Sequence, residues 1–172
     1  MKGLEESITV SIVHPTWQRT RAEEDDHIGW VFRSPSDDPV IPLSGFGSVS
    51  CEGCIPDTIN SFRTVRDIYE FSDDKAGKYT VPVLFCKETN RIVNNESSEI
   101  IRLLNRASDT TLDLYPEHLR DEIDEVNAWI YSQLNTGVYR CGFAQSQEAY
   151  AAAFEDVYSA LMRIENILST KR

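Results

Sequence analysis

Residues 80–105 hold the groups with the clearest potential for chemistry. An apolar run typical of a strand extends from Val81 to Phe85, but Pro82 lies inside it. Proline has no N–H to donate to a sheet, so it is out of place in a paired strand. A cis Val81–Pro82 bond would resolve this conflict, and it would leave the Val81 backbone free to pair with a ligand.

Glu96 and Ser97 stand where the next helix is expected to begin, just before an apolar segment at residues 100–104. The free N–H groups and the positive dipole end of a helix start favour an anion. The neighbouring Glu96 carboxylate is suited to an ammonium group. We therefore expect a pocket for an amino acid or peptide, with backbone pairing at Val81, a carboxylate at Ser97 and an ammonium at Glu96.

Cys51 and Cys54 form a C-x-x-C pair, which can serve as a redox dithiol or as half of a zinc site. No second pair stands at zinc-ligand spacing, and Ile55-Pro56 follows where a redox pair would open a helix. Both roles are therefore disfavoured, and we expect no metal. Cys86 follows a predicted strand and has no base beside it.

The composition limits the classes of partner. The chain has 172 residues and a formal net charge of −11, which disfavours binding to nucleic acid or anionic lipid. No apolar run is long enough for a transmembrane helix, and residues 1–6 lack the apolar core of a secretory signal. Four cysteines without an export signal fit a reducing compartment, so we expect a cytoplasmic protein with no nucleic-acid or membrane partner.

The first half of the chain alternates strand and helix patterns, which predicts an α/β domain over residues 1–106. Strands are expected at residues 8–13, 80–85 and 91–93, with a short strand-like piece at residues 29–32. The strand at residues 80–85 and the shorter one at residues 91–93 should form a hairpin across residues 87–90. A long loop is expected at residues 34–57 and a helix at residues 59–71.

The second half predicts an all-helical domain over residues 118–172, after a polar linker at residues 107–117. Apolar residues recur at helical spacing from Leu119 to Leu134 and again from Tyr150 to Leu168. We expect the second stripe to pack in a helical core. Residues 135–144 connect the two helices.

The segment Val-Pro-Val-Leu at residues 81–84, followed by Asn-Glu-Ser-Ser-Glu-Ile-Ile at residues 95–101, resembles the xi class of glutathione transferases. These are the glutathionyl-hydroquinone reductases, relatives of the omega class. Residues 14–20, 29–32 and 135–144 resemble the same family, in the same order along the chain. The resemblance extends from residue 2 to residue 172, with a gap at about residues 44–60.

This resemblance implies a thioredoxin-like N-terminal domain without its first strand, followed by part of the helical C-terminal domain of a glutathione transferase. It implies glutathione as co-substrate and a homodimer. Trp30, for which core packing is the alternative, would contact glutathione, and Tyr139 would lie in the substrate pocket. The glutathione-binding residues implied together are Trp30, Lys78, Val81, Pro82, Glu96 and Ser97.

The family's reaction uses a cysteine in a Cys-Pro-Trp-Ala-His-Arg-Thr motif at the start of the first helix. Its thiolate attacks the sulfur of a glutathionyl-hydroquinone and releases the hydroquinone, and a second glutathione resolves the mixed disulfide. The 172 residues do not contain this motif, so we expect a chain truncated at both ends, with no catalytic residue of its own. Glutathione-dependent reduction of these quinol conjugates is the expected family function. A non-catalytic glutathione-binding or interaction module is the alternative.

Overall fold

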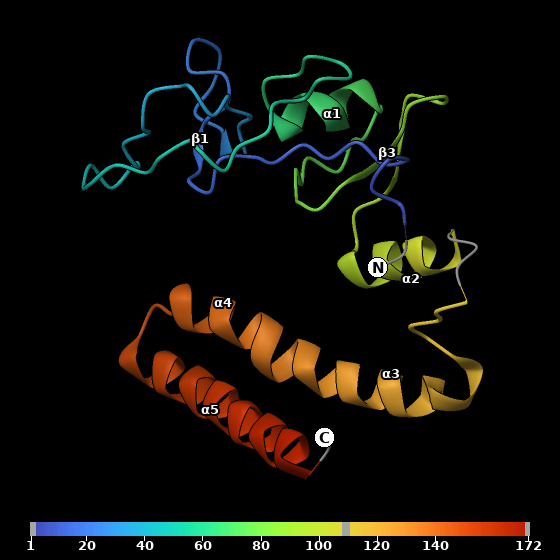
Figure 1. Cartoon of the computed structure of the whole chain (residues 1–172). Helices are drawn as coiled ribbons and strands as arrows, with labels where there is room; N and C mark the ends of the chain where they lie inside the picture. Colours follow the sequence, from blue (N-terminus) through green and yellow to red (C-terminus); the bar gives the residue numbers. More distant parts are fainter. Residues whose placement is uncertain (1–2, 108–110, 171–172) are drawn as a thin grey trace. The chain divides into compact units, whose positions relative to one another are not determined.

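The computed structural model describes residues 3–107 and 111–170 of the chain. The chain forms two compact units, Met1–Leu112 and Asp113–Arg172, which are described separately (Figure 1). The predicted linker at residues 107–117 spans this division, and residues 108–110 lie outside the described part. The domain boundaries at residues 106 and 118 stay a prediction.

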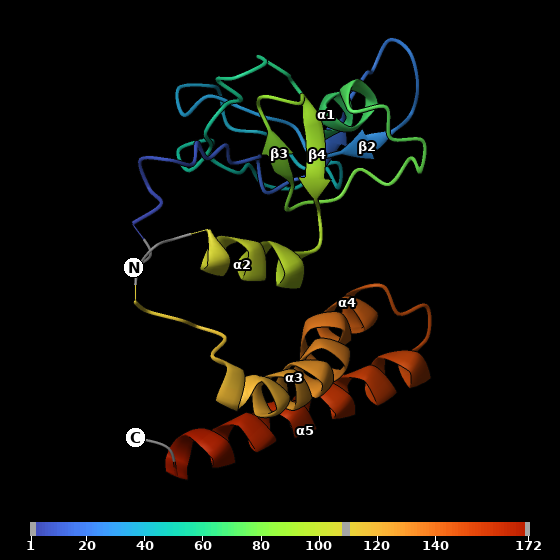
Figure 2. The ribbon, with the colours of Figure 1, turned by 90° about the vertical axis from the view of Figure 1, so that its right-hand side faces the viewer.

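The strands of the first unit are short. β1 (Gln18–Arg19) pairs antiparallel with β2 (Ile28–Gly29), and β3 (Leu84–Cys86) pairs antiparallel with β4 (Arg91–Asn94). Figure 2 shows β3 and β4 side by side, with the helix α2 (Ser97–Arg106) following β4. The predicted hairpin is therefore confirmed, but β3 begins later than predicted. Pro82, which cannot donate to a ladder, precedes it.

Residues 8–13 do not form the regular strand that their alternating pattern predicts. Instead they make isolated antiparallel bridges, from Ile12 to Ile55 and from Val13 to Phe32. The next residue, His14, is fully buried, and its ring accepts a hydrogen bond from the backbone N–H of Thr16. The segment thus pairs with two different partners over a few residues, which prevents a continuous ladder with either.

Helix α1 (Val65–Phe71) begins six residues later than the predicted helix at residues 59–71. The Asp57 carboxylate accepts hydrogen bonds from the N–H groups of Ile59, Asn60 and Phe62, which holds this stretch as a loop. The helix starts after Thr64, whose side chain forms a reciprocal capping box with Asp67.

Two arginines tie the turn between β1 and β2 to α1. Arg21 pairs with Asp67 at 3.0 Å and also with Glu70, while Arg66 pairs with Asp25 at 2.6 Å and with Glu70 at 2.7 Å. Burial of Asp67 opposes its ionisation, but hydrogen bonds from Arg21 and Thr64 outweigh burial and lower the pKa of this carboxyl. Hydrogen bonds with Arg66 and Arg21 likewise lower the pKa of Glu70.

These shifts predict a loss of stability in acid. A carboxyl whose folded-state pKa is lowered stabilises the fold above its unfolded pKa, and that contribution is lost as the pH falls through the folded pKa. We expect the thermal midpoint to fall between about pH 6 and about pH 3, and to fall less steeply in Asp67→Asn. Asp121→Asn, at an exposed position on the helix α3 (Arg120–Trp129), is the control. Equal slopes for the unaltered chain and Asp67→Asn would contradict this account.

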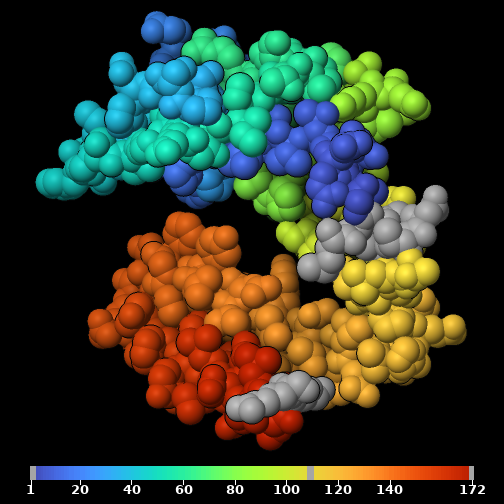
Figure 3. Space-filling view, viewed as in Figure 1, coloured from blue at the N-terminus to red at the C-terminus, as the bar shows by residue number. Residues whose placement is uncertain are grey.

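The second unit is helical, as predicted. It comprises a 3₁₀ turn (Glu117–Leu119), α3 (Arg120–Trp129), a π-helical segment (Ile130–Asn135), α4 (Thr136–Gly142) and α5 (Gln147–Thr170). The predicted connection at residues 135–144 is largely the helix α4. In the space-filling view of Figure 3, the side chains of α4 and α5 (orange and red) lie against one another. None of the described helices has the length and apolar character of a membrane span.

The apolar stripe of α5 is only partly buried within the described chain. The buried positions of α5 are the small residues Ala153 and Ala160. Tyr150 and Phe154 are 42% and 49% exposed, and their rings are stacked at 6.1 Å. The contact line of α5 therefore runs beside the large apolar residues rather than along them.

Gly137 explains how closely α4 and α5 pack. It is buried, and a Cβ added to it would lie 2.7 Å from Cγ2 of Val157 on α5. A Cβ at that separation requires either the Val157 side chain or one of the two helices to shift.

Gly137→Ala should therefore destabilise the helical unit by about 1–3 kcal/mol, because it overpacks this contact. Gly142→Ala is the matched control, since a Cβ there meets nothing within 4 Å. Thermal unfolding followed by circular dichroism would measure both. Val157→Ala should relieve much of the loss in the double variant. An unchanged midpoint in Gly137→Ala would rule out this close contact.

Candidate functional site

Two segments of the first unit come together at the predicted pocket. Leu84 of β3 is opposite Asn94 of β4, which brings the residues before β3 near those after β4. The amide nitrogen of Asn95 then donates a hydrogen bond of 3.1 Å to the hydroxyl of Thr80. Val81 and Glu96 each follow one member of this pair, so these two predicted site residues lie on neighbouring segments.

The peptide bond between Val81 and Pro82 is cis, as predicted. Val81 is 38% exposed, and within residues 3–107 its N–H and C=O make no backbone hydrogen bond. Its backbone groups are therefore available to an extended ligand, in the way that a strand edge accepts another strand.

Helix α2 (Ser97–Arg106) begins at the predicted position. Glu96 is its N-cap residue, with extended backbone and no side-chain capping bond. The Glu96 N–H donates to Oδ1 of Asn94 at 2.7 Å, and the first helical hydrogen bond runs from the Ile100 N–H to the Glu96 carbonyl at 2.9 Å. Ser97 is exposed at the helix start. This arrangement offers N–H groups and a hydroxyl to an anion, beside a carboxylate for a cation.

Lys78 and Trp30 are the other two predicted binding residues, and they differ in how they relate to Val81 and Glu96. Lys78 is exposed, and its carbonyl accepts a hydrogen bond of 3.0 Å from the Thr80 N–H, so it belongs to the same segment as Val81. Trp30 is half-buried, its ring meets Trp17 edge to face at 5.6 Å, and its carbonyl accepts from the Val65 N–H. These contacts do not bring Trp30 to Val81, so its role in binding stays a prediction.

Tyr139, the predicted substrate-pocket residue, lies on α4 in the helical unit and is 65% exposed. Its neighbour Arg140 pairs with Asp156 of α5 at 2.9 Å. Because the two units are described separately, the role of Tyr139 at the pocket also stays a prediction.

Comparison with known proteins gives the family. The chain is 40% identical over 177 residues to glutathionyl-hydroquinone reductase YqjG of Escherichia coli K12, an alignment that covers 100% of this chain and 47% of that protein. The alignment with the glutathione-bound structure of YqjG covers 99% of this chain and 50% of the YqjG chain, with a TM-score of 0.76 and 37% identity. The chain is homologous to the xi-class glutathione transferases.

Other xi-class proteins give the same result. Glutathionyl-hydroquinone reductase PcpF of Sphingobium chlorophenolicum is 40% identical over 98% of the chain and 48% of its own length. A second structure in complex with glutathione is that of the xi glutathione transferase ECM4 of Saccharomyces cerevisiae. Its alignment covers 98% of this chain and 53% of the ECM4 chain, with a TM-score of 0.77 and 31% identity. No protein-family model matches the chain.

These xi-class matches confirm the predicted fold class, a thioredoxin-like α/β domain followed by part of a glutathione-transferase helical domain. The relatives are enzymes, glutathione transferases or glutathionyl-hydroquinone reductases by name. The chain spans about half the length of the relatives it matches.

The four cysteines of this chain lie away from the starts of the described helices. Cys51 and Cys54 are in a loop and only 1% and 2% exposed, and burial together with the neighbouring Cys51 raises the pKa of Cys54. Cys141 is half-buried near the end of α4. Cys86 ends β3, and hydrogen bonds with the Thr89 side chain and backbone lower the pKa of its thiol. It is opposite Arg91, at the turn end of the hairpin and away from Val81 and Glu96.

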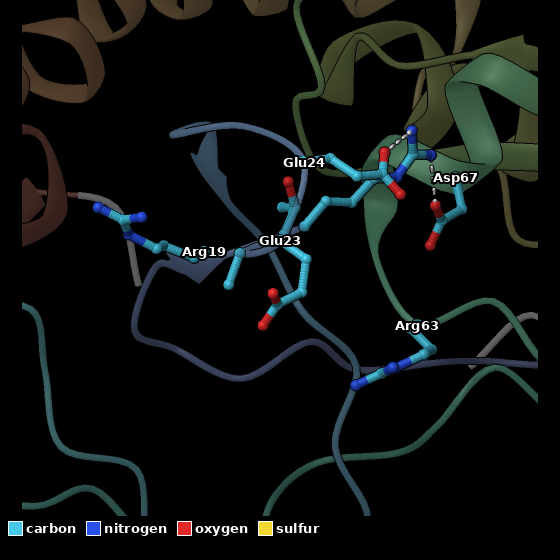
Figure 4. A pocket seen from close by; sticks show the side chains of 8 residues that line it. Arg19, Glu23, Glu24, Arg63 and Asp67 are labelled. Carbon is cyan, nitrogen blue, oxygen red and sulfur yellow. Dashed lines mark hydrogen bonds and ion pairs between the residues drawn. The ribbon is translucent and has the colours of Figure 1, made fainter.

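A polar depression elsewhere in this unit has no part in the predicted site. It is lined by residues 19–24, Arg63 and Asp67, and Figure 4 labels five of them. Arg21 pairs with Glu24 at 3.6 Å and with Asp67 at 3.0 Å. Arg19 pairs with Asp26 at 2.9 Å. Two of its three arginines are thus already paired with carboxylates.

The sequence interpretation missed two residues that adjoin the site, Tyr69 of α1 and Asn95. Tyr69 follows the helical pattern of a core residue, which hides its hydroxyl contact with Thr80 at 2.9 Å. Asn95 stands immediately before Glu96 and begins the segment that carries the family resemblance, but no role was predicted for its side chain. Only the tertiary structure brings them together, at 2.9 Å.

Proposed function

We propose that this chain binds glutathione and takes part in glutathione-dependent reduction of glutathionyl-hydroquinones. The observation that carries the proposal is the juxtaposition of the Val81 backbone with the start of α2 at Glu96 and Ser97. Homology to the reductases YqjG and PcpF supports the reaction class. Glutathione is bound in the structures of YqjG and ECM4, which supports the ligand.

Each part of glutathione has a matching group in this proposal. The γ-glutamyl carboxylate accepts hydrogen bonds from the Ser97 hydroxyl and the first N–H groups of α2, where the helix dipole favours an anion. The γ-glutamyl ammonium is bound by the Glu96 carboxylate. The cysteinyl backbone pairs with Val81, and Trp30, Pro82 and Lys78 add contacts. Tyr139 is proposed to contact the quinol part of the conjugate.

In this proposal, none of the four cysteines of the chain acts as the nucleophile. A thiolate of lowered pKa is favoured at a helix N-terminus, and none of the helices in the described ranges begins at a cysteine. The family's Cys-Pro-Trp-Ala motif would supply that thiolate, whose attack on the conjugate sulfur forms a mixed disulfide and releases hydroquinone.

The second candidate function is a module that binds glutathione without catalysing a reaction. The observation that favours it is that none of the four cysteines lies at the start of a described helix. Assembly as a homodimer, implied by the resemblance, stays a proposal.

Titration calorimetry with reduced glutathione tests the binding proposal. The matched ligand is cysteinylglycine, which lacks the γ-glutamyl group and so the groups that Glu96 and Ser97 are proposed to bind. We expect saturable binding of glutathione and much weaker binding of the dipeptide. Equal affinity for the two ligands would contradict recognition of the γ-glutamyl end.

A further inference from the structure

The Tyr69 hydroxyl is a buried polar group that joins three parts of the first unit. Tyr69 lies on α1 and is only 1% exposed. Its hydroxyl donates to the Thr80 carbonyl at 2.9 Å and accepts a hydrogen bond of 2.9 Å from the Asn95 amide nitrogen. The same nitrogen donates to the Thr80 hydroxyl at 3.1 Å, which closes a three-membered network.

The network lies directly beside the proposed ligand groups. Thr80 precedes Val81, whose free backbone is proposed to pair with the ligand, and Asn95 precedes Glu96, the first residue of the α2 start. A change of about 1 Å in the separation of these two segments would break simultaneous contacts of one small ligand with both.

Helix α1, which carries Tyr69, is itself held in place by side-chain contacts. The Thr64–Asp67 capping box sets its first turn, and the ion pairs of Arg21 and Arg66 hold its outer face. The Tyr69 hydroxyl is the buried member of this network, whereas Thr80 and Asn95 are exposed, so α1 anchors the two exposed segments through one buried group.

We propose that Tyr69 and Asn95 are positioning residues that set the spacing between Val81 and the start of α2 for glutathione binding. This inference rests on the proposed function. Neither residue need touch the ligand. The Tyr69 hydroxyl acts by fixing Thr80 and Asn95, and Asn95 acts by linking that hydroxyl to the residue before Glu96.

Tyr69→Phe tests the proposal because it removes the hydroxyl and keeps the buried ring. Loss of the hydrogen bonds that this hydroxyl makes with Thr80 and Asn95 should weaken glutathione binding about five- to tenfold in calorimetry. Tyr79→Phe is the matched control. Tyr79 lies close by, 5.7 Å from Tyr69 between ring centroids, but its hydroxyl contacts Glu70 rather than Thr80 or Asn95. Its affinity should change less than about twofold.

Asn95→Ala provides a second variant at an exposed position, which should leave folding intact. It should weaken binding as Tyr69→Phe does, and the double variant should lose less than the product of the two factors because both remove the same hydrogen bond. Thermal midpoints recorded for each variant separate folding from binding. A lower midpoint with unchanged affinity in Tyr69→Phe would show a merely structural role.

The wild-type titration separates the two proposals. Failure of the unaltered chain to bind glutathione would overturn the proposed function and the positioning role together. Binding by the unaltered chain with unchanged affinity in Tyr69→Phe and Asn95→Ala would overturn only the positioning role.

Discussion

Ser97→Ala should weaken glutathione binding about ten- to a hundredfold, because a hydrogen bond to a charged group contributes about 1.5–3 kcal/mol. The substitution removes the hydroxyl proposed to bind the γ-glutamyl carboxylate. It leaves the helix start otherwise intact, since Ser97 is exposed and Glu96 is the N-cap residue. Alanine is also the best helix former, so α2 should not be weakened.

Titration calorimetry measures this effect on the folded chain. Ser159→Ala, an exposed serine on α5, is the matched control and should leave the affinity unchanged. An affinity for glutathione that is the same in Ser97→Ala as in the unaltered chain would place the γ-glutamyl carboxylate elsewhere.

The second large effect concerns turnover. The 172-residue chain should release no hydroquinone from a glutathionyl-hydroquinone, although it binds the glutathione part. Binding groups orient the conjugate, but the reaction requires a thiolate in line with the conjugate sulfur. Supplying the family's Cys-Pro-Trp-Ala-His-Arg-Thr segment together with the family's further helices should give turnover, and a Cys→Ser change in that segment should abolish it.

Hydroquinone release in the presence of excess glutathione is the assay. Clear turnover by the unaltered chain would contradict the placement of the nucleophile. Cys86→Ser would then be the first variant to examine, since Cys86 is the cysteine whose pKa is lowered by hydrogen bonds. Cys51→Ser is the control, because this side chain is buried.

Local chemistry made two structural features of the candidate site predictable. Pro82 inside an apolar run indicated the cis bond, and Glu96-Ser97 before an apolar segment indicated the start of α2. Each signal depends on a few adjacent residues, so it survives in the sequence. The β3–β4 hairpin was predictable for the same reason.

Competition between local and tertiary contacts limited the rest. Residues 59–64 carry a helical pattern, but the Asp57 carboxylate binds three of their N–H groups and Ser61 adopts a positive φ of 59°. Residues 8–13 alternate like a strand, yet their partners change from Ile55 to Phe32 within two positions. Side-chain hydrogen bonds to the backbone can thus replace regular structure that periodicity favours.

The hydrogen bonds among Tyr69, Thr80 and Asn95 could not be predicted from the sequence for another reason. Tyr69, Thr80 and Asn95 are separated by 11 and 15 residues, and no local sequence pattern shows that their side chains meet. Gly137 is similar, since only the approach of Val157 from α5 shows why a side chain is excluded there. Both features depend on how elements pack rather than on local propensity.

The central claim is that glutathione binds between the Val81 backbone and the start of α2. Amide chemical-shift mapping of the isotope-labelled 172-residue chain during a glutathione titration tests it most directly. We predict the largest shifts at the amides of Val81, Ser97 and Ser98, with the same apparent dissociation constant at each. A saturating titration that leaves these amides unmoved, or that shifts only residues elsewhere in the chain, would contradict the claim.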